Sequence, residues 1–191
     1  MTTYYFDIET YGKKEEDSYN YEIITIQYQK ILQQTGKKLS GEPLTILKSW
    51  ENSEEEIIKK FLRKLNIKDK WNFTPVGSNL KYDFIVLSKR AKKYGLNIEL
   101  EKLLTHPHVD ISSTLFILNK GSFKGARLDT FTKKKKTGED ILDLYKDKKY
   151  DEIIEYIETE AKEFLKLYQW LLKTLPSVYE QHKKQPNSVF A

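Results

Sequence analysis

β-prone residues alternate between two faces at the start of the chain, over residues 3–9. One face of an extended segment would carry Tyr4, Phe6 and Ile8, and the other would carry Tyr5, Asp7 and Glu9. This period of two is that of a β-strand. Residues 21–29 and 44–49 repeat the pattern, and the polar stretch 33–41 between them is typical of a hairpin loop. We therefore expect three opening strands in antiparallel order.

The spacing of apolar residues then changes to that of helices. Ser53 and Glu56 form a capping box, and the apolar residues that follow it recur at helical spacing as far as Leu65. Short segments at 74–77 and 108–111 predict two further strands, with a helix at 82–94 between them. The longest helical pattern covers residues 149–175, and we expect Pro176 to stop that helix.

Together these elements predict one α/β domain over residues 1–176. Its mixed five-stranded sheet would consist of three antiparallel opening strands and then parallel strands, because strands joined through helices run parallel. Helices would flank the sheet, and residues 177–191 would form a C-terminal tail. A chain of 191 residues is long enough for one well-buried core and short for two.

The amino-acid composition excludes several kinds of site but says less about what the protein binds. The absence of cysteine excludes disulfides, thiolate zinc sites and cysteine nucleophiles. The first residues do not resemble a secretory leader, and no apolar run approaches the roughly 18 residues of a membrane span, so we expect a cytoplasmic protein without membrane contact. The net charge of +5 favours an anionic partner, although a surface rich in Lys and Glu is equally typical of heat-adapted proteins.

Two acids close the first strand. Asp7 and Glu9 are two positions apart, so both point to the same side of the sheet, where they repel each other unless a cation lies between them. A bare Asp-x-Glu pair is more often the solvated face of an edge strand. Here the opposite face of the strand is apolar and Tyr4-Tyr5-Phe6 leads directly into Asp7, which favours a metal site.

Three segments, taken in order, carry a resemblance to a known family. They are Phe6-Asp7-Ile8-Glu9-Thr10, then Gly77-Ser78-Asn79-Leu80-Lys81-Tyr82-Asp83-Phe84, and then Tyr156-Ile157-Glu158-Thr159-Glu160. In this order they resemble the three motifs of the DEDD 3′-to-5′ exonucleases, in the branch whose third motif contains a tyrosine. The resemblance covers residues 4–172 and implies a ribonuclease H-like fold. The family normally has Asp where this chain has Glu160.

The resemblance also implies a mechanism with two ions, Mg²⁺ or Mn²⁺. By correspondence with the family motifs, Asp7 would bridge both ions. Glu9 and Glu160 would complete the ion that activates water, and Asp83 would hold the second ion. Tyr156 would orient the attacking water. Thr10 and Asn79 would contact substrate, although Asn79 also suits the turn before a helix.

Helical geometry gives one check on the third motif. At about 100° per residue, Glu160 falls at the border of the apolar stripe of its helix and Tyr156 lies on the same flank. Glu158 borders the stripe on the opposite flank, so periodicity alone leaves it as an alternative acid. Because Mg²⁺ requires near-octahedral ligands, the longer side chain of Glu160 predicts lower activity or a preference for Mn²⁺.

A basic segment at residues 120–136 supplies candidate contacts to a nucleic-acid backbone. Its candidate substrate-binding residues are Lys124, Arg127, Lys133 and Lys134, with Phe123 and Phe131 available to stack on bases. The alternative is a solvated charged face. We interpret His108 and Asp110 as residues at a strand end.

These features predict a metal-dependent 3′-to-5′ exonuclease that acts on single-stranded DNA or RNA ends. A second hypothesis is a catalytically impaired nucleic-acid-binding module that keeps the exonuclease fold. A third, with less support, is a structural or partner-docking domain in which the acids are incidental.

Overall fold

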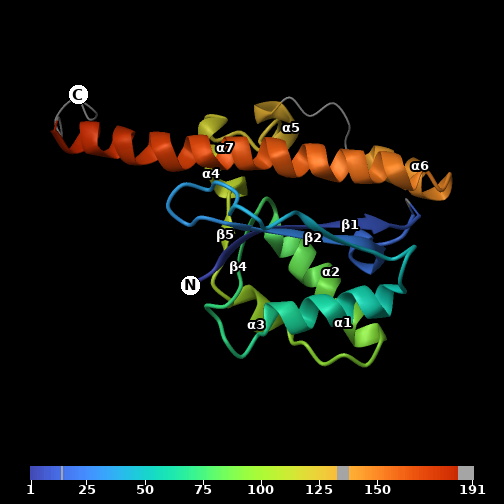
Figure 1. Cartoon of the computed structure of the whole chain (residues 1–191). Helices are drawn as coiled ribbons and strands as arrows, with labels where there is room; N and C mark the ends of the chain where they lie inside the picture. Colours follow the sequence, from blue (N-terminus) through green and yellow to red (C-terminus); the bar gives the residue numbers. More distant parts are fainter. Residues whose placement is uncertain (14, 133–137, 185–191) are drawn as a thin grey trace.

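Five strands form one mixed sheet in the computed structural model, which describes residues 1–13, 15–132 and 138–184 (Figure 1). The strands are β1 (Thr3–Tyr11), β2 (Glu22–Ile31), β3 (Thr45–Lys48), β4 (Thr74–Gly77) and β5 (Val109–Asp110), in the order β3-β2-β1-β4-β5. The pairs β1–β2 and β2–β3 are antiparallel, whereas β1–β4 and β4–β5 are parallel. The expected α/β fold is therefore confirmed, and its arrangement is ribonuclease H-like.

Helices cover both faces of this sheet. They are α1 (Glu54–Leu65), α2 (Leu80–Lys93), α3 (Leu100–Leu104), α4 (Ser112–Leu118), α5 (Leu128–Phe131), α6 (Gly138–Lys146) and α7 (Tyr150–Lys184), with a short 3-10 helix at Ser18–Asn20. Figure 1 shows α1, α2 and α3 below the sheet and α7 running along its upper side. The helices α4, α5 and α6 lie on the same side as α7 (Figure 1).

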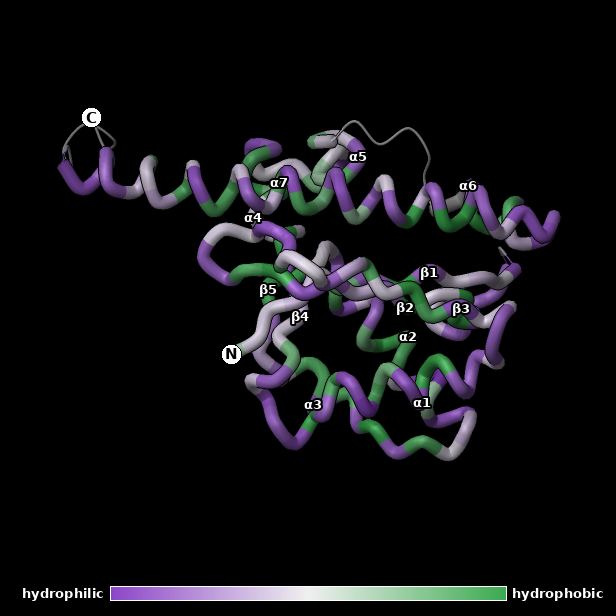
Figure 2. Tube along the Cα trace, viewed as in Figure 1, coloured by the Kyte–Doolittle hydropathy of each residue, from purple (hydrophilic) through white to green (hydrophobic). Residues whose placement is uncertain are grey.

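The side chains of β1 point alternately to the two faces of the sheet and so contribute to two separate parts of the core. Phe6 is fully buried against Phe61 of α1 and Phe84 of α2, with Tyr4 and Ile8 in the same cluster. On the other face Tyr5 packs against Phe164 of α7. Figure 2 shows the apolar positions of α7 turned toward the sheet along part of its length. The acids of β1 therefore lie on the face that α7 covers.

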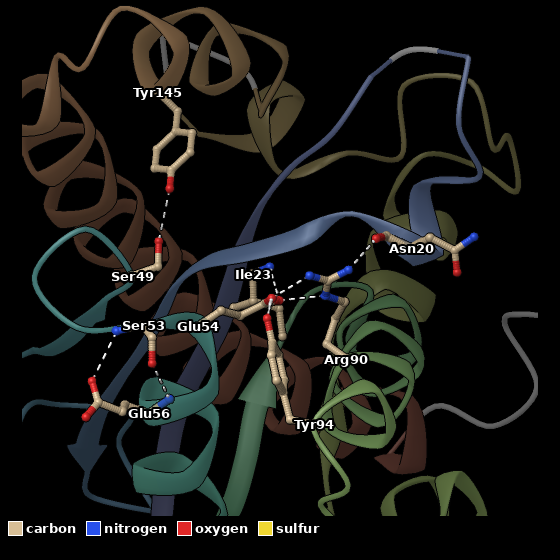
Figure 3. A network of polar contacts seen from close by, with 9 residues as sticks. All are labelled: Asn20, Ile23, Ser49, Ser53, Glu54, Glu56, Arg90, Tyr94 and Tyr145. Atoms are coloured by element: carbon tan, nitrogen blue, oxygen red, sulfur yellow. Dashed lines mark hydrogen bonds and ion pairs between the residues drawn. The ribbon is translucent and has the colours of Figure 1, made fainter.

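The capping box predicted for α1 is present. The Ser53 side chain accepts a hydrogen bond from the Glu56 backbone N–H (3.3 Å), and the Glu56 carboxylate accepts one from the Ser53 N–H (3.1 Å; Figure 3). The helix ends where Asn66 takes a left-handed conformation with φ 44°. Both signals are local, which is why the sequence predicts this helix well.

A buried ion-pair network connects α1 to α2 and β2 (Figure 3). Glu54, almost fully buried, accepts hydrogen bonds from the Ile23 N–H (2.7 Å), from Arg90 Nε (2.6 Å) and from the Tyr94 hydroxyl (2.6 Å). Arg90 also donates to the Asn20 carbonyl oxygen (3.0 Å). Burial and the charge of Glu54 raise the pKa of Tyr94 to about 12, so its hydroxyl remains a donor. The network ties the lower helices to the sheet.

The predicted end of the last helix is wrong. α7 continues through Pro176 to Lys184, so residues 177–184 of the expected tail are helical, and 185–191 lie outside the described residues. A proline removes one backbone hydrogen bond and bends a helix, but helical bonds on either side persist. The Ser177 hydroxyl donates to the Lys173 carbonyl oxygen (3.1 Å) beside the proline. Past the sheet this end of α7 projects alone (Figure 1).

Among the described residues, no helix has the length and apolar content needed to cross a membrane.

Candidate metal centre

Three acids from opposite ends of the chain meet on the upper face of the sheet. Asp7 and Glu9 of β1 and Glu160 of α7 each offer one carboxylate oxygen, and these atoms all lie within 4.8 Å of one another. Glu9 is buried, with 8% of its surface exposed, while the other two are half-buried. Glu158, the alternative acid of the third motif, is exposed and is not part of the group. The structure thus selects Glu160 of the two.

Asp83 adds a fourth carboxylate from the first turn of α2. It is 4% exposed, and its Oδ2 atom has no hydrogen-bond partner among the described residues. Burial raises the pKa of Asp83 well above its ordinary value, and the negative charges of Asp7 and Glu9 raise it further, followed by those of Asp110 and Glu160. Asp83 is not one of the group of three, but it lies in the electrostatic field of all of them. A buried, unpartnered carboxylate oxygen of this kind requires a compensating cation or proton.

Two polar side chains of β2 form consecutive hydrogen bonds that orient Asp7. The Gln27 side-chain amide donates to Asp7 Oδ2 (3.0 Å), and the Thr25 hydroxyl donates to Gln27 Oε1 (2.9 Å). Both β2 residues are fully buried. The antiparallel register pairs Asp7 with Gln27 and Glu9 with Thr25, so the same face of two neighbouring strands supplies the acids and their support. A carboxylate oriented this way presents its remaining lone pairs in a fixed direction.

Sequence reasoning missed Thr25 and Gln27. The signal was present, because the β2 segment Ile24-Thr25-Ile26-Gln27 alternates apolar residues with polar ones. These polar positions face the covered side of the sheet, the side that carries the acids.

Tyr156 lies one helical turn before Glu160 on α7 and is almost fully buried. Burial raises its pKa far above the ordinary value, and the charges of Glu9 and Glu160 and a hydrogen bond with Glu160 raise it further. The phenol therefore stays protonated at neutral pH and donates to acceptors around it.

The start of α2 is fixed by Asp110 and not by the side chain of Asn79. Asn79 takes a left-handed conformation with φ 62° and makes no side-chain cap. The Asp110 carboxylate instead accepts from the backbone N–H groups of Asn79, Leu80 and Ser112, each at 2.9 Å. We had interpreted Asp110 only as a strand-end residue. Its contacts to α2 hold the turn that precedes Asp83, and an acid near a helix N-terminus is favourable.

Thr10 also has a structural contact. It follows a β-bulge between Glu9 and Thr10, and its hydroxyl lies 3.2 Å from that of Tyr82 on α2. The Tyr82 hydroxyl in turn donates to the Ser18 carbonyl oxygen (3.1 Å). This contact joins the end of β1 to the helix that carries Asp83.

The other predicted substrate-binding residues do not form one group. Asn79 and Arg127 line a hollow of about 560 Å³, and Lys124 is exposed on the same loop as Arg127. Lys133 and Lys134 lie outside the described residues.

The donor set fits a hard divalent cation. Every ligand candidate is a carboxylate, and oxygen ligands of this kind are those that Mg²⁺ and Mn²⁺ prefer. The buried oxygen of Asp83 that lacks a partner, and the close approach of the three other acids, both leave negative charge that a cation would offset.

Comparisons with known proteins add no family assignment. No protein-family model matches the chain, and no curated protein matches it significantly in sequence.

Proposed function

We propose that this protein is a metal-dependent 3′-to-5′ exonuclease that hydrolyses phosphodiester bonds at single-stranded DNA or RNA ends. The observation that carries the proposal is the meeting of Asp7, Glu9 and Glu160 within 4.8 Å, with the buried Asp83 in their field. These acids come from β1, α2 and α7 of a ribonuclease H-like fold. Direction of cleavage and preference for ends come from the resemblance of the three ordered motifs to DEDD exonucleases.

The chain's own residues have distinct parts in such a reaction. When bound, two divalent ions would acidify the attacking water and stabilise the leaving oxygen. Asp7, Glu9 and Glu160 would hold one ion, and Asp7 with Asp83 the other. Gln27 fixes the orientation of Asp7 through its amide. Tyr156 can position Glu160 or a water through its hydroxyl, which forms a hydrogen bond with Glu160.

The test is trimming of an oligonucleotide with a 5′ label. With Mg²⁺ or Mn²⁺ the protein should produce a ladder of products that shorten from the 3′ end, and single-stranded DNA and RNA of one sequence should be compared. Asp7→Ala should abolish the ladder. Asp147→Ala, which removes an exposed aspartate, is the matched control and should trim normally. Equal trimming by Asp7→Ala and the control would reject the proposal.

A second candidate is a catalytically impaired module that binds nucleic acid with the same fold. It is favoured by one observation, the Glu at position 160, whose side chain is one methylene longer than that of the family's Asp. Oligonucleotide binding that persists in EDTA, with no cleavage under Mg²⁺ or Mn²⁺, would identify this candidate. The cytoplasmic location stays a prediction from the sequence.

A further inference from the structure

The hollow that Asn79 and Arg127 line lies next to the start of α2. It is lined at one side by Ser78 and Asn79, which precede α2, and at the other by Phe116 of α4 and by Phe123 and Arg127 of the following loop. Its volume is about 560 Å³. Asn79 precedes Asp83 by one helical turn, so the hollow and the candidate metal centre share the first turn of α2.

The loop that forms the outer wall of the hollow is held in shape by its own hydrogen bonds. Asn119 Nδ2 donates to the carbonyl oxygens of Ser122 (2.6 Å) and Lys124 (2.9 Å). Gly121 and Gly125 have φ of 76° and 90°, a conformation that residues with a side chain rarely adopt. The loop therefore has a defined conformation that exposes the residues between the two glycines.

What the loop presents is an aromatic ring. Phe123 is 83% exposed, and its ring centroid lies 4.4 Å from that of Phe116, which supports it. The exposed ring leaves apolar surface in water, and its burial against a flat apolar partner would be favourable. A supported ring with a free surface matches the way single-strand-binding proteins stack bases.

The charges around this ring favour an anionic partner. Lys120, Lys124 and Arg127 are exposed, and none of them forms an ion pair with another residue of the described segments. Cations that lack internal partners beside an exposed aromatic ring complement the two parts of a nucleotide, its phosphate and its base.

We propose that this hollow is a base-stacking subsite for single-stranded nucleic acid, in which an unpaired base stacks on Phe123 and the adjoining phosphates contact Lys124 and Arg127. The inference deepens the proposed function, on which it rests for the identity of the strand as substrate. A base inside a duplex is already stacked on both faces, so this subsite accepts only unpaired bases. It makes the protein select single-stranded ends.

The test is fluorescence anisotropy with a labelled single-stranded oligonucleotide of about 12 nucleotides at low salt in EDTA. Chelation prevents cleavage, so the measured Kd does not depend on catalysis. Phe123→Ala should raise the Kd by about 5- to 100-fold, and Phe123→Trp should keep it near that of the unmodified protein. Ile117→Ala is the matched control, because Ile117 is 72% exposed on α4 and does not line the hollow.

The salt dependence of binding distinguishes the contribution of the Phe123 ring from that of Lys124 and Arg127. Each phosphate contact on a single strand contributes about 0.7 to the slope of log K against log salt concentration. The double variant Lys124→Ala, Arg127→Ala should therefore flatten the slope by about 1.4, whereas Phe123→Ala should weaken binding with the slope unchanged. A blunt duplex of the same sequence should bind equally well to Phe123→Ala and to Ile117→Ala.

The outcomes distinguish this inference from the proposed function. Equal Kd values for Phe123→Ala and Ile117→Ala would overturn the subsite, whether or not the protein trims oligonucleotides. No binding of any oligonucleotide at low salt would also overturn it and would point to a protein partner for the ring. Weaker binding by Phe123→Ala without any trimming by the unmodified protein would keep the subsite and reject the exonuclease.

Discussion

Replacing Asp83 with Asn tests whether the acids form a cation site. The substitution keeps the shape of the side chain and removes its charge from a position that is 4% exposed. Burial and the charges of Asp7 and Glu9 raise the pKa of Asp83 well above its ordinary value of 3.8. Without metal, the folded protein therefore holds a proton on Asp83 over a range of pH in which the unfolded chain has lost it.

The sign of the effect on stability follows from that proton. A carboxyl whose folded pKa is raised does not weaken the fold below about pH 4, and it lowers the free energy of unfolding as pH rises from there to the folded pKa. The loss is about 1.4 kcal/mol for each pH unit in that range. For a chain of this length it lowers the melting temperature by about 3 to 6 °C per pH unit. Asp83→Asn does not undergo this loss. The difference between its melting temperature and that of the unmodified protein should therefore increase with pH.

The assay is thermal unfolding of both proteins in EDTA from pH 4 to pH 8. The melting temperatures should be close at pH 4, and Asp83→Asn should melt higher at pH 8 although it has lost trimming activity. Saturating Mg²⁺ should shrink the difference in melting temperature, because a ligand at about 100 times its Kd adds about 2.7 kcal/mol to the fold that binds it. A difference between the two proteins that stays constant with pH would refute the electrostatic reasoning. A melting temperature of the unmodified protein that does not respond to divalent cations would refute the cation site.

Three further predictions concern neighbouring groups. Gln27→Ala should weaken the apparent affinity for Mn²⁺ in the trimming assay by about 10- to 100-fold, because Asp7 loses the donor that orients it. Glu160→Asp should raise the ratio of Mg²⁺-supported to Mn²⁺-supported trimming by up to about 100-fold, since the shorter side chain has the length found in the exonucleases that the three motifs resemble. An unchanged ratio would show that side-chain length at this position does not set metal preference. Glu54→Ala should lower the free energy of unfolding by about 3 to 5 kcal/mol in urea denaturation, because Arg90 is left buried without its partner. The double variant Glu54→Ala, Arg90→Ala should recover part of that loss, and equal losses in the single and double variants would contradict this explanation.

The parts of the fold that the sequence predicts correctly are those set by local signals. The alternation of β1 and the capping box at Ser53 place a strand and a helix without reference to the rest of the chain. The end of α7 could not be predicted this way. A proline is a reliable stop only where nothing else sustains the helix, and here the helical hydrogen bonds continue on both sides of Pro176.

The candidate site was predictable to the extent that it follows from spacing along one element. Asp7 and Glu9 share a strand face, and Tyr156 and Glu160 share a helix flank. The contributions that arise only from pairing between elements were missed. Gln27 supports Asp7 because of the β1–β2 register, and no pattern within either strand specifies that register.

The same reasoning explains why Glu160 and not Glu158 joins the acids. Both side chains flank the apolar stripe of α7, so the choice depends on how the helix is rotated about its axis when it packs on the sheet. Tyr5 contributes to that rotation, because it packs against Phe164 in a cluster that also contains Ala161. Tyr5 and Asp7 point to the same face of β1, two residues apart, and Phe164 follows Glu160 by one turn of α7. The aromatic contact therefore helps to bring Asp7 and Glu160 together, and the apolar core of the upper face positions the acidic cluster beside it.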